Sequence, residues 1–331
     1  MNSPTVDFSV AICTYNGGSR LPKVFKSILN LCNSRNLYWE LVVVDNNSSD
    51  NTKQVILEHS NRWRKDSQVR YLFEPNQGVT YARQLALKET RSELIGFLDD
   101  DNLPEVHWLE SAYEFGQAHP NAGAYGGKIH AFLDEPEPSY FKDIQKFLAV
   151  NDRGDEPLCF LNTDHPRRVP AAPGSVVRRL AWKEQAPGSL LLGGRDEKRG
   201  TGSGSCEDLE FMYHIQSSGW EVWYNPDMIV RHHIPKYRYE EKYLLNIAYN
   251  SGLSNHALRI AKRRKTGSRN LFPFLIFFYC LCTLAYLLVD GLKAANYYVR
   301  YRFTFSRNIG RACIMKEKTG KLVSPFWIGQ P

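Results

Sequence analysis

The sequence predicts an α/β fold with a parallel-dominated mixed sheet, helices on both faces and an apolar helix near the C-terminus. Three observations lead to this prediction. Over the first hundred residues, apolar strand-like segments alternate with helical patterns. Such alternation is typical of parallel sheets, because each crossover between parallel strands usually contains a helix. The strand-like segments end in polar or acidic residues, and residues 271–289 contain no charge.

The first elements follow from periodicity and turn chemistry. Phe8–Thr14 is apolar and ends in an Asn-Gly-Gly turn, which predicts a strand. A helix is expected over about Leu21–Cys32, where apolar residues recur at helical spacing. Glu40–Asp45 is continuously β-branched and apolar, as buried parallel strands are. Capping residues at 46–50 predict a second helix from about Thr52.

The same signals extend along the chain. We expect a strand at Val69–Phe73, a helix at Gly78–Glu89 and a buried strand at Leu94–Leu98. Later segments are predicted as a strand at Gly123–Phe132, a mobile glycine-rich loop at Gly188–Ser205, a helix at Glu207–Ser217 and a strand at Glu221–Arg231. The segment between, to roughly Trp182, carries no regular pattern.

Asp99, Asp100 and Asp101 follow one buried strand directly. Three adjacent carboxylates repel one another, so they need a positive partner. Mg²⁺ and Mn²⁺ prefer oxygen ligands, and Mg²⁺ is usually held by one or two carboxylates plus substrate phosphates. Because ligands of parallel sheets bind beyond the carboxyl ends of the strands, this triplet is a candidate metal and diphosphate site. A solvated acidic turn is the alternative explanation.

Three further groups of polar residues lie at the ends of predicted elements. Asp45 ends a strand, where a carboxylate can bind a base or ribose or can simply cap the next helix. Glu207 and Asp208 open a helix; they fit a general base, or acids favoured by the helix dipole. His232, in an Arg-His-His run, could complete a metal shell or bind phosphate, although a lone histidine is more often structural.

The order of these motifs resembles the family 2 glycosyltransferases, which have the Rossmann-like GT-A fold. The motifs are VAICTYN, ELVVVDNNSSD, EPNQGVTYARQLAL, ELIGFLDDDNLP, CEDLEF and VRHHIPKYR, and the match covers roughly Phe8–Tyr243. HHIPKYR and the apolar C-terminal run are similar to bacterial exopolysaccharide members, in particular the hormogonium polysaccharide glycosyltransferases of cyanobacteria. The chain departs from the family at Cys206, where glycine is usual. It also lacks the QxxRW motif of the processive members, so a polymerising synthase is not expected.

The resemblance implies a role for each matching residue. It implies an inverting, metal-dependent enzyme of the hexosyltransferase type that moves a sugar from a nucleotide-sugar to an acceptor hydroxyl, with Mg²⁺ or Mn²⁺ as cofactor. Asp208, with Glu207, would be the catalytic base. The expected metal ligands are Asp101, Asp99 and His232. The expected nucleotide-sugar-binding residues are Thr14, Tyr15, Asn16, Asp45, Arg83, Asp99 and Asp100, with Arg238 as a weaker candidate.

Two regions are predicted: a catalytic domain at 1–250 and a membrane-associated region at 251–331. The run at 271–289 is long enough to span a bilayer or to lie in it, and basic clusters at 259–269 and 293–321 flank it. A buried core helix is the alternative. We expect attachment to the cell membrane with the catalytic domain on the cytoplasmic side, a glycan or lipid-linked acceptor, and no nucleic-acid partner.

Two other functions fit parts of the sequence. The loop at 17–23 resembles faintly the glycine-rich loop of sugar nucleotidyltransferases, which need neither the late Glu-Asp pair nor a membrane segment. A catalytically inactive GT-A scaffold is the non-enzymatic alternative. The acids at Asp45, Asp99, Asp101 and Asp208 argue against that scaffold, since loss of at least one would be expected.

Overall fold

The computed structural model describes residues 5–64, 67–160, 169–185, 207–216, 218–244 and 246–247. The strands are β1 (Phe8–Thr14), β2 (Trp39–Asp45), β3 (Ser67–Phe73), β4 (Leu94–Asp99), β5 (Asn102–Pro104), β6 (Ala122–Leu133), β7 (Leu158–Cys159), β8 (Val176–Arg178) and β9 (Glu221–Ile234). The helices are α1 (Leu21–Leu29), α2 (Thr52–Ser60), α3 (Val79–Glu89), α4 (Trp108–Ala118), α5 (Phe141–Ile144), α6 (Arg179–Gln185) and α7 (Glu207–Gln216), with 3-10 turns η1 (Gln145–Leu148) and η4 (Lys236–Tyr239).

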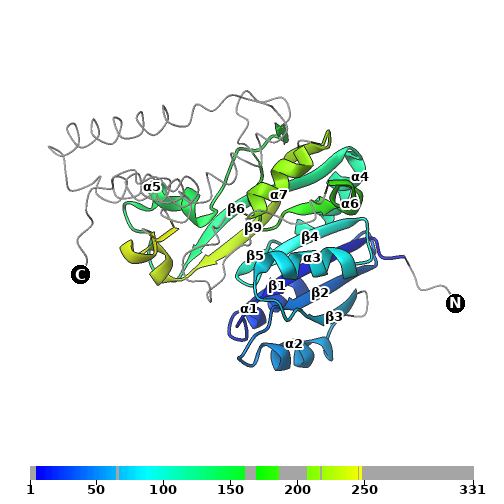
Figure 1. Ribbon diagram of the computed structural model, residues 1–331. Coiled ribbons are helices and arrows are strands. Elements are labelled where there is room, and N and C mark those ends of the chain that lie inside the picture. The colour runs from blue at the N-terminus through cyan, green and yellow to red at the C-terminus, as the bar shows by residue number, and fades with distance from the viewer. Residues whose placement is uncertain are drawn as a thin grey trace, which may run out of the picture.

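The strands form one mixed sheet in the order β3-β2-β1-β4-β8-β6-β9-β5, with β7 also paired to β9. The first four strands in this order are parallel, as the sequence predicts. β8 is antiparallel to both β4 and β6, while β6 and β9 are parallel. The sheet is therefore parallel on one side and mixed on the other (Figure 1).

Alternate side chains of the strands pack on opposite faces of the sheet. Val10 and Ile12 of β1 belong to a buried cluster with α1, α2 and α4. Ala11, between them, belongs to a second cluster with α3, α6 and α7. Because successive strand residues point to opposite faces, a continuously apolar strand such as β1 must be covered on both sides. The predicted helices on both faces are confirmed.

β6 and β9 run side by side past the rest of the sheet toward α5 (Figure 1). Their pairing continues to Leu133 and Ile234, where a third cluster buries Phe141, Leu148 and Tyr239. The register shifts between Gly126 and Lys128. A side chain at the intervening Gly127 would lie 1.8 Å from the carbonyl oxygen of Met228, so glycine permits this close approach. The extension places His232 near the end of β9.

The predicted segments correspond to β1, β2, β3, β4, β6, β9, α1, α2, α3 and α7, with end shifts of a few residues. The predicted helix at 21–32 ends at Leu29, and Arg64 Nη1 donates to the carbonyl oxygens of Leu29 and Leu31 at this end. The middle segment is more regular than its sequence suggests, since it contains β8 and α6. The predicted loop at 188–205 and the apolar run at 271–289 lie outside the described residues. Among the helices that the structure describes, none has the length and apolarity to cross a bilayer.

Candidate functional site

The carboxyl ends of three parallel strands bring predicted site residues together. Thr14 at the end of β1 is in register with Asp45 at the end of β2. On the other side of β1, Cys13 is in register with Asp99 at the end of β4. Parallel strands end at the same edge of a sheet, and that edge is where ligands bind in open α/β folds. Burial and the nearby Asp99 raise the pKa of the Cys13 thiol to about 12, although Arg83 opposes the shift, so this thiol stays neutral.

Asp45 is almost fully buried and holds two parts of the chain in place. Its Oδ1 accepts a 3.0 Å hydrogen bond from the Ser48 amide. Its Oδ2 accepts a 3.0 Å bond from the hydroxyl of Tyr71 on β3. Burial and this bond to Asp45 raise the pKa of Tyr71 to about 12. A carboxylate has about four acceptor positions, so Asp45 can still bind a further donor such as a nucleoside N–H.

The loop after β1 is held by side chains of the loop after β2. Asn16, with φ of 48°, accepts a 2.9 Å bond from the Ser49 amide. The amide of Gly17 donates to Thr52 Oγ1, and that of Gly18 to Asp50 Oδ2. Phosphate-binding loops need free backbone N–H groups, and here these two groups are already bonded. The loop at 17–23 therefore does not favour the nucleotidyltransferase alternative.

Each carboxylate of the Asp99-Asp100-Asp101 triplet pairs with a different arginine. Arg83 Nη2 on α3 lies 3.6 Å from Asp99 Oδ1. Arg20 binds Asp100 through two bonds, Nε to Oδ1 at 2.9 Å and Nη2 to Oδ2 at 2.7 Å. Arg238 Nη1 donates to Asp101 Oδ2 at 2.8 Å. The positive partners that the sequence requires are thus supplied within the protein.

These environments separate the pKa values of two of the three carboxyl groups. Burial raises the pKa of Asp99; Arg83 opposes the rise and the charge of Asp101 adds to it. Burial also acts to raise the pKa of Asp101, but its neighbours His232 and Arg238 outweigh it, Arg238 through a charged hydrogen bond, and hold that pKa well below the usual range. Asp101 is therefore held in its ionised form at neutral pH.

Asp101, His232 and Arg238 form a compact group. His232 Nε2 lies 3.5 Å from Asp101 Oδ2. Arg238 Nη1 is 3.0 Å from the same His232 nitrogen and 2.8 Å from the same Asp101 oxygen. Arginine only donates, so His232 Nε2 must accept and carry a lone pair. The ring proton is then on Nδ1, which donates to the carbonyl oxygen of Leu148 at 2.8 Å. That bond fixes the tautomer and the ring orientation.

Strand pairing places this group. β5 pairs antiparallel with the end of β9, with Asn102 opposite His232. The amide of His233 donates to the carbonyl oxygen of Asp101 at 2.9 Å. Asp99 ends β4, and Asp100 and Asp101 connect this parallel part of the sheet to β5 beside β9. Residues far apart in sequence meet because this short connection is bonded at both ends.

Asp208 lies on α7 in a pocket near this edge of the sheet. The pocket is lined by Arg83, Phe97, Trp182, Asp208 and Phe211 among others, and its walls are mostly apolar. A carboxylate in a pocket with mostly apolar walls is suited to act as a general base. Glu207 begins α7, and its side chain lies outside the described residues.

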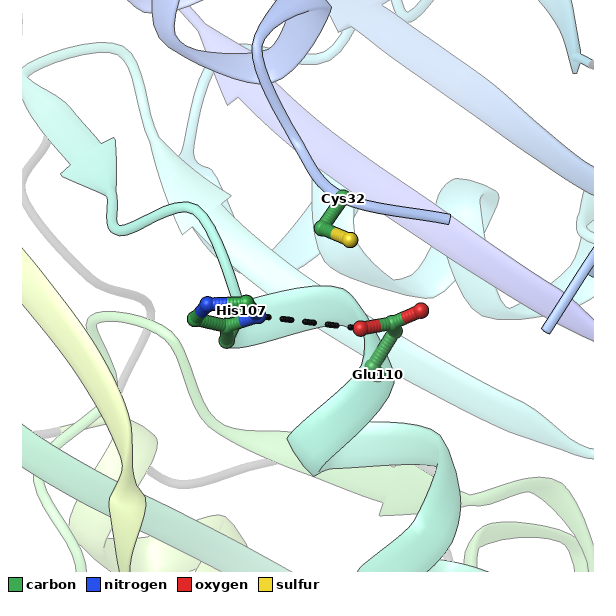
Figure 2. Close-up of side chains that lie close together, drawn as sticks. All are labelled: Cys32, His107 and Glu110. Atoms are coloured by element: carbon green, nitrogen blue, oxygen red, sulfur yellow. Dashed lines mark ion pairs between the residues drawn. The ribbon is translucent and has the colours of Figure 1, made fainter. Parts of the chain in front are cut away.

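One three-donor group occurs among the described residues, and it lies elsewhere. Cys32, His107 and Glu110 bring their ligand atoms within 4.8 Å of one another (Figure 2). Glu110 Oε1 accepts bonds from the amide and hydroxyl of Ser34, so this carboxylate holds the turn after α1. The His107 side chain is 74% exposed and lies 3.7 Å from Glu110 Oε2. Rigid metal sites fix their histidine through a second bond, and none is recorded for His107 in the described part of the chain.

The structure brings most of the predicted site residues to one edge of the sheet, in three groups: Thr14 with Asp100, Asp99 with Arg83, and Asp101 with His232. Thr14 donates to Asp100 Oδ2 at 2.6 Å, and the Tyr15 carbonyl accepts from Arg20. Asp101 and His232 meet, whereas Asp99 faces Arg83, so the predicted triad of Asp99, Asp101 and His232 does not converge on a single point. Arg20 is the site residue that the motifs do not indicate. A basic residue just after the Asn-Gly-Gly turn is the signal that could have found it.

Comparisons with known proteins identify a matching family and several similar proteins. The model of glycosyl transferase family 2 matches residues 9–183. The succinoglycan biosynthesis protein ExoM of Rhizobium meliloti is 22% identical over 79% of this chain and 78% of its own. The glucosyl-dolichyl phosphate glucuronosyltransferase of Haloferax volcanii is 22% identical over 95% and 97% of the two chains. The crystal structure of GalNAc-T7 with UDP, GalNAc and Mn²⁺ aligns at a TM-score of 0.52 and 15% identity, over 76% of this chain and 48% of that one.

Proposed function

From the premise that the chain belongs to glycosyl transferase family 2, a family of GT-A-fold enzymes, we propose that it is an inverting, metal-dependent glycosyltransferase that moves a sugar from a nucleotide-sugar to an acceptor hydroxyl in glycan biosynthesis. One observation carries the proposal beyond the family. Asp101 Oδ2 and His232 Nε2 lie 3.5 Å apart, and both contact the same nitrogen, Nη1 of Arg238. The bond to the Leu148 carbonyl fixes the tautomer of His232.

The residues of this pair fit a divalent cation. Asp101 is ionised, and Asn102 Nδ2 donates to its other oxygen at 2.9 Å. His232 presents a lone pair on Nε2. Metal-binding carboxylates and imidazoles are commonly oriented by outer hydrogen bonds of this kind. Mg²⁺ or Mn²⁺ would take Asp101 and His232 as ligands and the diphosphate as another, with Asp99 the further candidate. When bound, the ion would neutralise the charge of the leaving diphosphate.

The protein's own residues would perform the transfer as follows. Asp208 accepts the proton of the acceptor hydroxyl. The hydroxyl oxygen forms a bond to the anomeric carbon from the face opposite the nucleotide. The bond from that carbon to the diphosphate oxygen breaks, and its electron pair leaves with the nucleoside diphosphate. A single displacement inverts the configuration, through a transition state with oxocarbenium character like that of sugar hydrolysis.

Nucleotide binding would use the ends of β1 and β2. Asp45 is fixed by Ser48 and Tyr71, so a base or ribose would meet a preorganised acceptor. Thr14, Tyr15 and Asn16 would form the adjoining wall of the nucleotide site. Arg83 faces both Asp99 and the pocket that contains Asp208, which suits contact with the diphosphate or the donor sugar. Asp100 would act by holding Thr14 and Arg20, because both of its oxygens are bonded to them.

The acceptor we propose is a glycan attached to a membrane lipid. The relative from Haloferax volcanii is named for an acceptor of this class, glucosyl-dolichyl phosphate. The charge-free run at 271–289 and its basic flanks suit a membrane surface with anionic lipids. The catalytic domain would then face the cytoplasm, where nucleotide-sugars are found.

Nucleotide release by the full chain, purified in detergent, tests the proposal. The protein is incubated with UDP-, GDP- and dTDP-sugars, with Mn²⁺ or Mg²⁺, and with polyprenyl-phosphate-linked sugars as acceptors. We expect release from one donor, loss of release with EDTA, and loss in Asp101→Ala. Asp227→Ala, an exposed carboxylate on β9, is the matched control and should retain activity.

The stereochemistry of the product tests the second half of the proposal. An NMR coupling constant at the new linkage should show the configuration opposite to that of the donor. Retention would overturn the single displacement. Turnover that is unaffected by EDTA and by Asp101→Ala would overturn metal dependence while leaving the transferase activity.

A further inference from the structure

Arg238 occupies the position that a metal ion would share between Asp101 and His232. Its Nη1 donates to Asp101 Oδ2 at 2.8 Å and lies 3.0 Å from His232 Nε2. An imidazole nitrogen has one lone pair, which lies in the plane of the ring. The atom that donates to this lone pair therefore stands in the direction from which a metal ion would bind. Arg238 and a metal ion cannot use His232 at the same time.

The arginine is held there as part of the fold. Arg238 belongs to η4, which follows Pro235, and its amide donates to the Pro235 carbonyl at 2.9 Å. The next residue, Tyr239, is buried against the cluster at the end of β6 and β9, and its carbonyl accepts a 3.1 Å bond from Tyr140. The backbone on either side is thus fixed, and the side chain alone would have to move.

The guanidinium is only partly satisfied where it lies. Arg238 Nε is buried and makes no hydrogen bond to any described residue. The Arg238 side chain is 19% exposed, so it has access to solvent on one side. Asp100 and Asp99 are already paired with Arg20 and Arg83, so Arg238 has no second carboxylate of the triplet to move to. An incoming anion would provide a new negatively charged partner for Arg238.

We propose that Arg238 is the resident cation of the Asp101–His232 pair, and that a divalent ion binds there only after displacing it. This inference rests on the proposed metal-dependent function. Without nucleotide, the arginine neutralises Asp101 and keeps the affinity for the metal low. A nucleoside diphosphate offers the displaced guanidinium a new anionic partner, so the nucleotide and the metal enter together. Arg238 thereby acts as a positioning residue that makes metal binding depend on the donor.

Competition by Arg238 should weaken metal binding by a measurable factor. If the state with Arg238 displaced is populated at about one tenth, the apparent dissociation constant of the metal is raised about tenfold, and removing the competitor restores it. A neutral side chain at position 238 should therefore bind Mn²⁺ more tightly than arginine does. Loss of any nearby positive charge should also raise the affinity for Mn²⁺ to some extent. The control variant must therefore remove a positive charge as well.

Binding of Mn²⁺ alone, followed by the EPR signal of the free ion, is the test. The variants are Arg238→Met and Arg238→Gln, because the glutamine amide can still donate to Asp101 and hold the fold. Arg231→Met is the matched control: Arg231 lies seven residues earlier on β9 and pairs with Glu105 instead. Asp101→Asn reports whether the ion binds at this pair. Each titration is made without and with UDP or GDP, and thermal melts confirm that each variant is folded.

Without nucleotide, we expect both Arg238 variants to bind Mn²⁺ about tenfold more tightly than the unsubstituted protein. With nucleoside diphosphate present, this difference in the dissociation constant for Mn²⁺ should narrow. Arg231→Met should change the affinity less than about threefold, since exposed charges are screened. Equal affinity for Mn²⁺ in the unsubstituted protein and both Arg238 variants, with binding lost in Asp101→Asn, would overturn the competition and leave the metal site standing. Absence of Mn²⁺ binding in every protein, even with nucleotide, would overturn both proposals.

Discussion

The hydroxyl of Thr14 donates a 2.6 Å hydrogen bond to Oδ2 of Asp100, which ties the end of β1 to the chain leaving β4. Arg20 binds both oxygens of the same carboxylate and also the Tyr15 carbonyl. These contacts join the loop at 15–20 to the aspartate triplet. Asp100 therefore shapes the site by positioning its neighbours.

Replacing Arg20 by alanine should destabilise the protein. The side chain of Asp100 is 13% exposed, and its charge would lose a bidentate partner. We expect a loss of roughly 1–3 kcal/mol in the free energy of unfolding, measured by urea denaturation. Arg35→Ala is the control, because the Arg35–Glu114 pair is largely exposed and should contribute less than about 1 kcal/mol. Equal losses in both variants would contradict the structural role of Arg20.

Replacing Asp208 by asparagine should abolish transfer and leave nucleotide binding intact. Loss of a general base typically lowers kcat by about 10²–10⁴-fold. Single-turnover assays with the identified donor measure transfer, and calorimetry measures binding of the nucleoside diphosphate. Asp227→Asn controls for the loss of an acid on the surface. Normal turnover in Asp208→Asn would assign the base to another residue.

The parallel half of the fold could be predicted because its strands are long and continuously apolar. β1, β2 and β4 bury nearly every residue, so pattern alone indicates them. β8 has only Val176, Val177 and Arg178, a run too short to carry a period. Its strand character comes from pairing with β4 and β6 on either side, which no local pattern encodes.

Part of the predicted site follows from local sequence, and part of its surroundings depends on long-range pairing. The acids of the triplet and His232 are candidates because they lie at the ends of predicted strands. The sequence also predicted that the triplet needs positive charge, but it could not show that three arginines supply it. Arg20 and Asp100 are 80 residues apart, and Arg238 and Asp101 are 137 apart. Such pairs form only when folding brings distant loops to the same edge of the sheet.

His232 and His233 should behave differently although they are adjacent. His232 faces Asp101, whereas His233 Nε2 lies 2.7 Å from Asp134 Oδ1 on the other side of the strand. We expect His232→Ala to weaken Mn²⁺ binding by at least roughly 10-fold, since even the outer partners of metal ligands are worth about 10–100-fold, and His233→Ala to change it little. The measurement is made with nucleoside diphosphate present, so that Arg238 is displaced in both variants. A similar loss of Mn²⁺ affinity in the two variants would contradict the assignment of His232 as the ligand.

The Asp101 carboxylate should make the stability of the protein depend on acid pH. Its pKa is held below the usual value in the folded protein because its neighbours His232 and Arg238, the latter through a charged hydrogen bond, outweigh burial. A folded-state pKa below the unfolded value, which is about 3.9, means that the unfolded chain binds the proton more readily. The stabilisation is therefore complete above the unfolded pKa and is lost as the pH falls toward the folded one.

Comparison with Asp101→Asn measures this effect. At neutral pH, the variant should be less stable by roughly 3 kcal/mol, because Arg238 loses its buried partner. The difference in the free energy of unfolding should stay constant from about pH 7 to pH 5 and narrow below about pH 4. Asp143→Asn, an exposed acid on α5, should show no such trend. If the difference in the free energy of unfolding is the same at acid and neutral pH, Arg238 does not stabilise the Asp101 carboxylate. The electrostatic basis for a cation position beside Asp101 is then removed.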